Sequence, residues 1–483
     1  MSSHGLERWW ALVNNPVRLI AFYLPQYHPI PENDLWWGNG FTEWSNVARA
    51  RPFFPGHYQP HLPADLGFYD LRLAEVREAQ AKLAAEYGIY GFCYHHYWFN
   101  GRRLLERPFN EVLASGKPEF PFCICWANGN WTRGWDGSEQ AVLIEQRHSH
   151  QDDVQFIRSL LPAFRDRRYI KVDGKPLLIV YHSKLLPDPV KTSATWRAEV
   201  RAAGFPDLYL IRAETHTSYG KYPNASALGF DAALEFPPHA VACKTLRVAD
   251  SQYSDSNNTI IDYRKVVRHS IKRSTPDYKL FRGLMPSWDN TARRKKGAHI
   301  FAHSSPELYR YWLAECIRWT RRHHTGEEQI VFINAWNEWG EGCHLEPDQR
   351  YGYQFLEATR TALRRSENPV AFADLPSACD DQPASKQPTD EVAARASEFL
   401  SENLDLNWKR QDECMQINET NISTQSVLVP QIRLDSLLAD YLLAEDPSFR
   451  RTRKAFYRVL KPIWRTWLAV HSPRQSTAVR IRR

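Results

Sequence analysis

The sequence predicts an α/β fold, a (β/α)₈ TIM-type barrel followed by a helical, basic C-terminal appendage. Eight apolar runs alternate with stretches of helical spacing, which is typical of parallel strands joined by helices. Aromatic or polar clusters follow these runs, as expected where the carboxyl ends of barrel strands converge. An open doubly wound sheet is the alternative fold, but the sequence has no GxGxxG or P-loop pattern to support it.

The predicted strands are rich in β-branched and aromatic residues. Between the first two, Leu71–Tyr87 has apolar residues at helical spacing and predicts a helix, with Gly88 as its C-cap. Glu307–Arg322 predicts another helix directly before the last strand. The eight predicted strands are Arg18–Tyr27, Ile89–Trp98, Phe120–Ala127, Pro176–His182, Leu208–Glu214, Phe230–Phe236, Lys279–Ser287 and Gln329–Trp336.

The composition along the chain divides it into four parts. We expect an N-terminal extension over residues 1–17 and the catalytic barrel over 18–365. Residues 366–390 are rich in Pro, Ser, Asp and Gln and are interpreted as a linker. Residues 391–483 are predicted to form a helical tail with a strongly basic end.

The basic end of the tail accounts for the positive net charge of the chain, which is formally +7. Residues 447–483 contain eleven Arg or Lys and no Asp or Glu, with Trp464 and Trp467 among apolar residues near helical spacing. Such a segment suits the surface of an anionic membrane, where each basic residue contributes about 1 kcal/mol. The alternatives are a docking helix for a partner or the barrel, and nucleic-acid binding, which nothing in the barrel supports.

The cysteines and the N-terminus both favour a cytoplasmic protein, peripheral on the inner face of the plasma membrane if the tail binds there. The eight cysteines form no CxxC pair and no zinc-finger spacing, and Cys93, Cys123 and Cys125 lie in apolar runs. The N-terminus lacks the apolar core of a signal peptide, and no run of 18 apolar residues occurs.

We predict no cofactor. We also predict no metal site, since the adjacent His95 and His96 point to opposite faces of a strand.

Tryptophan is unusually frequent in this sequence. The chain has 18 Trp against 3 Met, and aromatic residues make up 13% of it. Flat rings with a polar handle are suited to stacking on the C–H faces of sugars, although a Trp-rich core is the alternative explanation. We therefore expect carbohydrate to be the ligand.

The strongest candidate for chemistry is the loop after the last predicted strand, which reads Asn-Glu-Trp-Gly-Glu. Its carboxylates, Glu338 and Glu341, are three residues apart among indole and glycine. Glycosyl transfer needs one group that protonates the leaving oxygen and a second that acts as nucleophile or base. Two carboxylates in a partly apolar cage repel each other, which separates their pKa values and assigns the two roles. Because ExxE is a common pattern, two solvated glutamates are the alternative.

Other clusters at the strand ends supply the candidate substrate contacts. The loop after the first strand is rich in Trp and Gly, and it could equally be packed by its own aromatics. A lone Asp at a strand end, such as Asp289, is also a common helix N-cap. The candidate substrate-binding residues are Tyr23, Gln26, Tyr27, His28, Trp37, Glu43, Trp44, His95, His96, Trp98, Trp126, Asn128, Trp131, Trp288, Asp289, Trp336, Asn337 and Trp339.

Four stretches of the chain resemble the WbsX-type glycosyltransferases, which are also described as glycoside hydrolase family 99-like proteins. The resemblance runs from about Arg18 to about Glu357. The stretches are FYLPQYHPIPENDLWWGNGFTEWSNVARARPFFPGHYQPHLPADLGFYDLR, GIYGFCYHHYWFNGRRLLERPFNEVL, FCICWANGNWTRGWDG and INAWNEWGEGCHLEPD. The resemblance implies a role in bacterial O-antigen and surface polysaccharide biosynthesis. The related hydrolases are retaining endo-α-mannosidases with a (β/α)₈ fold and no required metal.

The resemblance also implies roles for both glutamates. In those hydrolases an Asn-Glu-Trp-His-Glu motif carries both catalytic acids. Its first Glu matches Glu338, which would deprotonate the 2-hydroxyl of the sugar and give an anhydro-sugar intermediate. Its second Glu matches Glu341, the acid/base. This sequence departs from the motif with Gly340 in place of His.

The sequence thus predicts a retaining enzyme that makes or cleaves glycosidic bonds in an oligosaccharide or polysaccharide, free or lipid-linked. Water or a sugar hydroxyl would intercept the same intermediate. A sugar-nucleotide-dependent glycosyltransferase is the first alternative, although no clear DxD motif is present. A carbohydrate-binding protein without catalysis is the second, and the presence of both Glu338 and Glu341 argues against it.

Overall fold

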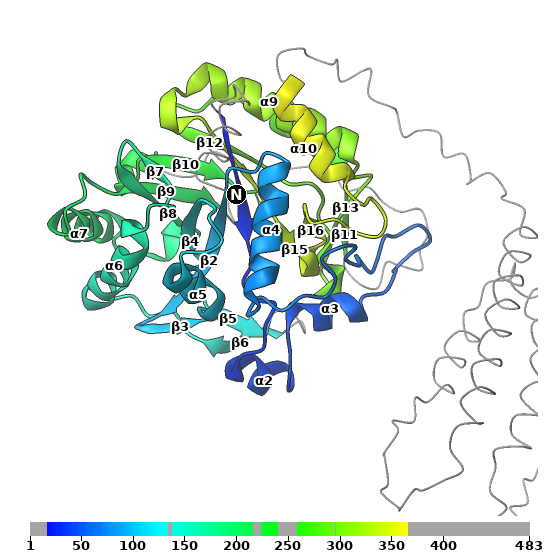
Figure 1. Ribbon diagram of the computed structural model, residues 1–483, viewed down its shortest axis with the longest axis horizontal. Coiled ribbons are helices and arrows are strands. Elements are labelled where there is room, and N and C mark those ends of the chain that lie inside the picture. The colour runs from blue at the N-terminus through cyan, green and yellow to red at the C-terminus, as the bar shows by residue number, and fades with distance from the viewer. Residues whose placement is uncertain (1–16, 134–137, 216–223, 240–257, 295, 366–483) are drawn as a thin grey trace, which may run out of the picture. The chain divides into compact units, whose positions relative to one another are not determined.

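The computed structural model describes residues 17–133, 138–215, 224–239, 258–294 and 296–365. Eight parallel strands form one closed sheet in this part of the chain, because the last strand pairs again with the first. Helices lie around the outside of the strands (Figure 1). The predicted barrel is confirmed, and the open sheet is excluded. Around the barrel the strands are β1 (Arg18–Tyr23), β2 (Gly91–Phe99), β4 (Phe122–Trp126), β8 (Lys175–Val180), β9 (Tyr209–Glu214), β10 (Ala232–Glu235), β12 (Leu280–Leu284) and β14 (Ile330–Ile333).

Each of the eight predicted runs overlaps one barrel strand, and several strands end before the run does. The first predicted run continues to Tyr27, whereas β1 ends at Tyr23. The seventh continues to Ser287, whereas β12 ends at Leu284. The remaining residues turn into the loops at the carboxyl ends of the strands, so the apolar pattern extends into the region that holds the site.

Helices cover the barrel between successive strands. The two helices predicted from spacing are confirmed as α4 and α9. Gly88, with φ +92°, follows α4, and its N–H bonds to the carbonyl of Ala85. Ser305 caps α9 by accepting a hydrogen bond from the N–H of Leu308. The covering helices are α4 (Ala74–Glu86), α5 (Arg107–Ser115), α6 (His150–Arg165), α7 (Pro189–Ala202), α8 (Tyr263–Ile271), α9 (Pro306–His323) and α10 (Gln354–Arg365).

Successive residues of a barrel strand face opposite layers of the fold. The ring of Phe22 lies 4.7 Å from that of Phe236, which follows β10 on the far side of the barrel, so Phe22 fills the interior. The next residue, Tyr23, points outward and donates a hydrogen bond to Gln80 of α4. The same alternation separates pocket residues from packing residues in the other strands.

Short elements in the loops at the carboxyl ends of the strands build the walls of the site. They follow β1, β4, β10, β12 and β14. They are α2 (Pro31–Trp37), α3 (Glu43–Arg49), the hairpin of β5 (Trp131–Arg133) and β6 (Ser138–Ile144), the parallel pair of β11 (Thr259–Asp262) and β13 (His299–Ala302), η5 (Asn290–Ala292), β15 (Asn337–Glu338), η7 (Trp339–Glu341) and β16 (Cys343–His344).

Several predictions concern residues outside the described part of the chain. These are residues 1–16 of the N-terminal extension, the linker 366–390 and the tail 391–483 with its basic segment 447–483. Among the described residues, no helix combines the length and apolarity needed to cross a bilayer. Cys93, Cys123 and Cys125 are free and buried in the strands, as expected of small apolar residues.

Candidate active site

Glu338 and Glu341 lie in the loop that follows the last barrel strand. Asn337–Glu338 (β15) pairs antiparallel with Cys343–His344 (β16), and η7 (Trp339–Glu341) connects them. This tight turn fixes both carboxylates at the carboxyl end of β14. Parallel barrels build their active sites at this end.

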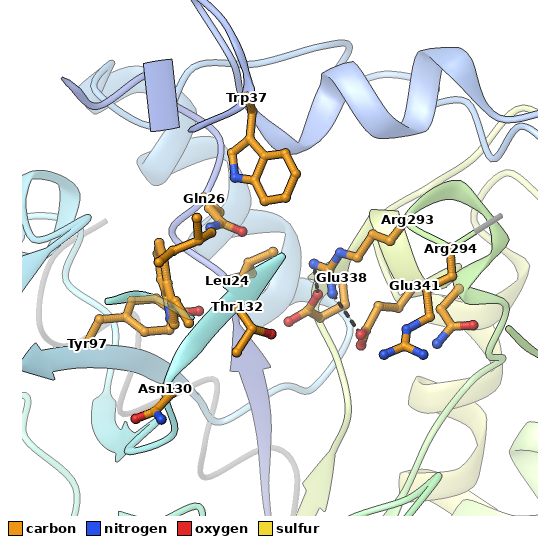
Figure 2. A pocket seen from close by; sticks show the side chains of 13 residues that line it. Leu24, Gln26, Trp37, Tyr97, Asn130, Thr132, Arg293, Arg294, Glu338 and Glu341 are labelled. Atoms are coloured by element: carbon orange, nitrogen blue, oxygen red, sulfur yellow. Dashed lines mark hydrogen bonds and ion pairs between the residues drawn. The ribbon is translucent and has the colours of Figure 1, made fainter. Parts of the chain in front are cut away.

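Arg293 joins the two glutamates through one guanidinium group. It follows η5, in the loop after β12. Its Nη2 lies 2.8 Å from Oε2 of Glu338 and its Nη1 lies 2.7 Å from Oε1 of Glu341. The same guanidinium contacts Glu43 of α3, with Nε 3.1 Å from Oε2. Figure 2 shows Arg293 reaching both Glu338 and Glu341.

One cation therefore faces three carboxyl groups, and two of them, Glu341 and Glu43, have raised pKa values. Burial raises the pKa of Glu341 to about 8, Arg293 opposes the rise, and the charges of Glu338 and Glu43 add to it. Burial likewise raises the pKa of Glu43, with Arg293 opposing. At neutral pH Glu341 therefore carries a proton, which is the state that a general acid requires.

The raised pKa of Glu341 makes the stability of the fold depend on pH. An unfolded Glu has a pKa of about 4.3. The contribution of Glu341 to the free energy of unfolding is fully present below the unfolded pKa, and it is lost as the pH rises through the folded pKa of about 8. We expect the free energy of unfolding of the wild type to fall relative to that of Glu341→Gln between these values, by at most about 1.4 kcal/mol per pH unit. Urea denaturation of both proteins from pH 5 to 9 measures this difference, and parallel curves would contradict it.

Gly340 has no side chain, and the Arg293–Glu43 pair occupies the space where a side chain would lie. A Cβ atom at this position would lie 2.8 Å from Nε of Arg293 and closer still to Oε2 of Glu43. Real Cβ atoms essentially never approach neighbours so closely. Any side chain at residue 340 would therefore displace the guanidinium that holds the two glutamates.

The glutamates lie between two adjoining pockets. The tryptophan lobe, about 320 Å³, is lined by Trp37, Trp131 and the polar side chains of Gln26, Asn130 and Thr132. The histidine lobe, about 610 Å³, is larger. Both volumes fall in the range of small-molecule sites. The side chains that distinguish the histidine lobe are His95, Tyr181, Phe236, His239, Trp288 and His299, and the residues shared by both lobes are Tyr97, Asn290, Arg293, Arg294, Glu338 and Glu341.

Seven of the predicted site residues line these lobes. Gln26, Trp37 and Trp131 belong to the tryptophan lobe, and Trp37 overhangs it in Figure 2. His95 and Trp288 belong to the histidine lobe, and Nε2 of His95 lies 3.9 Å from Oε1 of Glu338. Glu338 and Glu341 line both lobes.

A second group of predicted substrate contacts forms a buried scaffold beneath the glutamates instead, which corrects the prediction. Asn337 bonds through its side chain to both the N–H and the carbonyl of Leu24. The hydroxyl of Tyr27 donates to the carbonyl of Asn337 and accepts from the N–H of Trp339. Trp44 donates its indole N–H to the carbonyl of Tyr69. These side chains fix the loop, and they are too buried to touch a ligand.

Glu346 stabilises the same buried scaffold through hydrogen bonds. Its carboxylate accepts hydrogen bonds from the indole of Trp339 at 2.7 Å, the hydroxyl of Tyr69 at 2.7 Å and the amide of Gln80 at 2.6 Å. Tyr23, another predicted contact, orients the amide of Gln80. The chain thus uses a buried carboxyl to position the tryptophan that separates Glu338 from Glu341.

A third group of predicted contacts faces outward into the helices, which also corrects the prediction. Trp126 is fully buried, and its ring stacks on Phe156 of α6 at 4.2 Å. Trp98 donates its indole N–H to Asp152 of α6. His96 is buried, and its burial lowers its pKa well below the usual value. Strand alternation explains all three, because the residues next to them in the chain, His95, Tyr97 and Ala127, line the histidine lobe.

The remaining predicted contacts are also structural. His28 bonds to the carbonyl of Pro25, and Asn128 bonds to the backbone of residue 182. Trp336 is fully buried, with its ring 5.2 Å from that of Phe92. Asp289 accepts from the N–H of Thr291 as the N-cap of η5, the alternative that its position suggested. Glu43 is buried and serves as a partner of Arg293.

The sequence prediction missed Arg293, which is central to the site. Arg293 follows the Trp-Asp-Asn cluster after β12 by three residues. No pattern marks it, because its three partners come from two distant loops. Tyr97 was also missed, although its alternation with His95 on β2 is a signal that places it in the pocket.

Comparison with known proteins relates most of the chain to one family. A family model described as "Glycosyltransferase WbsX" matches residues 19–359. Two relatives, both named "Uncharacterized protein WxcX" and both from strains of Xanthomonas campestris pv. campestris, are 46% identical to the chain over 365 residues. The match covers 75% of the chain and 52% of each relative. The chain therefore spans about half the length of the curated relatives that it matches.

Solved structures of similar shape are more distant. A "Glycoside hydrolase-like protein" is 17% identical, with a TM-score of 0.45, covering 74% of this chain and 96% of the other. The family 99 endo-alpha-mannosidase from Bacteroides thetaiotaomicron is 14% identical, with a TM-score of 0.43, covering 72% of this chain and 98% of the other. Both likenesses concern the shape of the chain alone, and its own strand pairing establishes the barrel.

Proposed function

The chain belongs to the WbsX glycosyltransferase family, and from that premise we propose that it makes or cleaves glycosidic bonds of a bacterial surface polysaccharide or its lipid-linked precursor. The observation that carries the proposal is the pair of glutamates on one guanidinium, Glu338 and Glu341 on Arg293, between two pockets. The arrangement suits a retaining reaction with two carboxyl groups.

Glu341 is the proposed general acid. Its raised pKa, about 8, keeps a proton available at neutral pH. As the bond between the anomeric carbon and the leaving oxygen breaks, Glu341 gives its proton to that oxygen and becomes a carboxylate. Arg293, 2.7 Å away, stabilises the charge that appears there.

Glu338 is the proposed base or nucleophile. In the route that the family resemblance implies, Glu338 takes the proton of the sugar 2-hydroxyl, and the oxygen of that hydroxyl attacks the anomeric carbon to give an anhydro sugar. Arg293 holds Glu338 through Nη2, which fixes its direction. In the second step Glu341 removes a proton from water or a sugar hydroxyl, and that oxygen opens the anhydro ring while Glu338 returns the first proton.

The two lobes support binding of sugars on both sides of the acids. The indoles of Trp37 and Trp131 offer faces for sugar C–H groups, and Gln26, Asn130 and Thr132 offer hydrogen bonds to hydroxyls. The histidine lobe has room for a larger group. Substrate and product would then meet at Glu338 and Glu341.

Trp131 and Trp126 provide a matched test of the pocket, because they lie in one segment but in different layers. Trp131→Ala is expected to weaken glycan binding roughly tenfold, about 1.4 kcal/mol, without unfolding the chain. Trp126→Ala is expected to destabilise the fold by about 3–5 kcal/mol, because it empties a buried stack on Phe156. Titration calorimetry and thermal denaturation measure both, and the reverse pattern would remove Trp131 from the pocket.

A product screen tests the function itself. The protein is incubated with lipid-linked oligosaccharides and with surface polysaccharide, each with and without nucleotide sugars, and products are analysed by mass spectrometry. Shortened or rearranged glycans without nucleotide sugar support the proposal if Glu341→Gln abolishes them. Transfer that requires a nucleotide sugar supports the sugar-nucleotide-dependent alternative. Glycan binding without any product supports the carbohydrate-binding alternative.

The proposed place of the reaction is the inner face of the plasma membrane. The support is the basic segment 447–483, with eleven basic and no acidic residues. The full chain should float with anionic vesicles at low salt, and a chain ending at Glu445 should not. Equal flotation of both would exclude the segment as an anchor.

A further inference from the structure

A buried cluster of two histidines and an aspartate lies beside the scaffold of the active site. His344 is in β16, Asp348 follows it by four residues, and His61 comes from the loop after α3. Their exposed fractions are 3%, 3% and 6%. The ring of Trp339 stacks on that of His344 at 3.7 Å, so the cluster supports the loop of the two glutamates. None of the three residues lines either lobe.

The spacing of the polar atoms fits a single metal ion. Nδ1 of His61 lies 3.0 Å from Nε2 of His344, and Nε2 of His344 lies 3.8 Å from Oδ2 of Asp348. Each residue offers one ligand atom within 4.8 Å of the others. Atoms about 2.0–2.2 Å from one zinc ion lie about 3 to 4 Å from each other. Small movements of these side chains would complete such a site.

Neighbouring groups orient the three side chains toward the centre of the cluster. Nδ1 of His344 lies 2.9 Å from the carbonyl of Glu346, so it donates and leaves the lone pair of Nε2 on the cluster side. Oδ1 of Asp348 accepts from the N–H groups of Arg350 and Tyr351, which leaves Oδ2 directed at His344. Metal-binding histidines and carboxylates characteristically have such outer partners.

A tyrosine also lies beside the cluster. The hydroxyl of Tyr58, whose ring stacks on His61 at 4.1 Å, is buried beside Asp348.

We propose that His61, His344 and Asp348 hold one divalent transition-metal ion, with Zn²⁺ as the best fit to two imidazoles and a carboxylate. Water or the Tyr58 hydroxyl would be the fourth ligand. The ion would tie the loop after α3 to β16, and thereby brace the turn that carries Glu338 and Glu341. Its role is structural, and it is independent of the function proposed above.

Metal analysis of the full chain, purified without a metal-affinity column, tests the proposal. We expect about one zinc per chain by elemental mass spectrometry. Removal with a chelator should lower the melting temperature, and added Zn²⁺ should restore it. Added Co²⁺ should give the absorption bands of a tetrahedral site. These measurements need no substrate, so their failure would leave the proposed function untouched.

Variants assign the ion to the cluster. His61→Gln should lose the metal. His57→Gln is the matched control and should keep it, because His57 is a buried histidine that pairs with Asp289 outside the cluster. Less than about 0.1 zinc per chain before and after incubation with Zn²⁺, and no Co²⁺ bands, would show a hydrogen-bonded histidine pair only and overturn the proposal. This result can be read on the wild type even if the variants fail to fold.

Discussion

Replacing Glu341 with Gln is expected to leave a folded protein whose turnover is lower by about 10²- to 10⁴-fold or more, and Glu338→Gln is expected to do the same. Each substitution is isosteric and adds no charge to a site in which three carboxyl groups surround one cation, so repulsion within the site does not rise and the fold should persist. Glu341→Gln removes the proposed proton donor, and Glu338→Gln removes the proposed base or nucleophile. Turnover of the glycan found in the product screen measures the effect.

The control for this pair is Glu307→Gln, at the exposed first turn of α9, which should retain full activity. Circular dichroism and thermal denaturation should show all three variants folded. Near-normal turnover of Glu338→Gln or Glu341→Gln would remove that residue from its proposed role. Loss of activity in Glu307→Gln would show that the assay responds to nonspecific changes.

Arg293→Met is expected to lower both the stability and the activity of the protein strongly. The substitution keeps much of the side-chain volume but leaves the buried carboxylate of Glu43 without its cation. Breaking a buried ion pair by removing one partner typically costs about 3–5 kcal/mol. Activity should fall as well, because Glu338 and Glu341 lose the group that orients them. Urea denaturation and turnover measure the two effects.

The double variant Arg293→Met with Glu43→Gln separates the two roles of Arg293. The added Glu43→Gln removes the stranded charge, so part of the stability should return while activity stays low. Arg293→Lys keeps the charge but cannot reach three carboxylates with a planar fork, and should fall between wild type and Arg293→Met. A wild-type stability for Arg293→Met would show that the pairing with Glu43 contributes nothing net.

The fold could be predicted because strand pairing and helix spacing leave local signals. All eight predicted strands occur, since a parallel barrel buries both faces of each strand and so produces apolar runs. The same physics explains the errors in the site. An apolar run gives no sign of which face of a strand meets the pocket, so His96 and Trp126 were assigned to substrate with His95.

The number of tryptophans in the sequence likewise gives no sign of which of them face the pocket. Among the described residues, Trp126, Trp196, Trp312, Trp336 and Trp339 are fully buried. Trp37, Trp131 and Trp288 line the lobes. The excess of indoles therefore serves the core as well as the pocket. Position in the fold, and not frequency, distinguishes the two uses.

Arg293 could not be found in advance, because its significance lies in three contacts with distant residues, of which the contact with Glu43 spans 250 residues of chain. Glu338 and Glu341 were found because they share one short motif. A site built from a single loop is visible in one sequence, whereas a site completed by a distant loop becomes visible only when the barrel closes.

The absence of a side chain at Gly340 has an evolutionary consequence. The space that a side chain at this position would need is filled by Arg293 and Glu43. A mutation to His at this position alone would expel the guanidinium, and loss of Arg293 alone would strand a buried charge. Residues 43, 293 and 340 are therefore coupled, because a side chain at residue 340 requires Glu43 and Arg293 to move or to change as well.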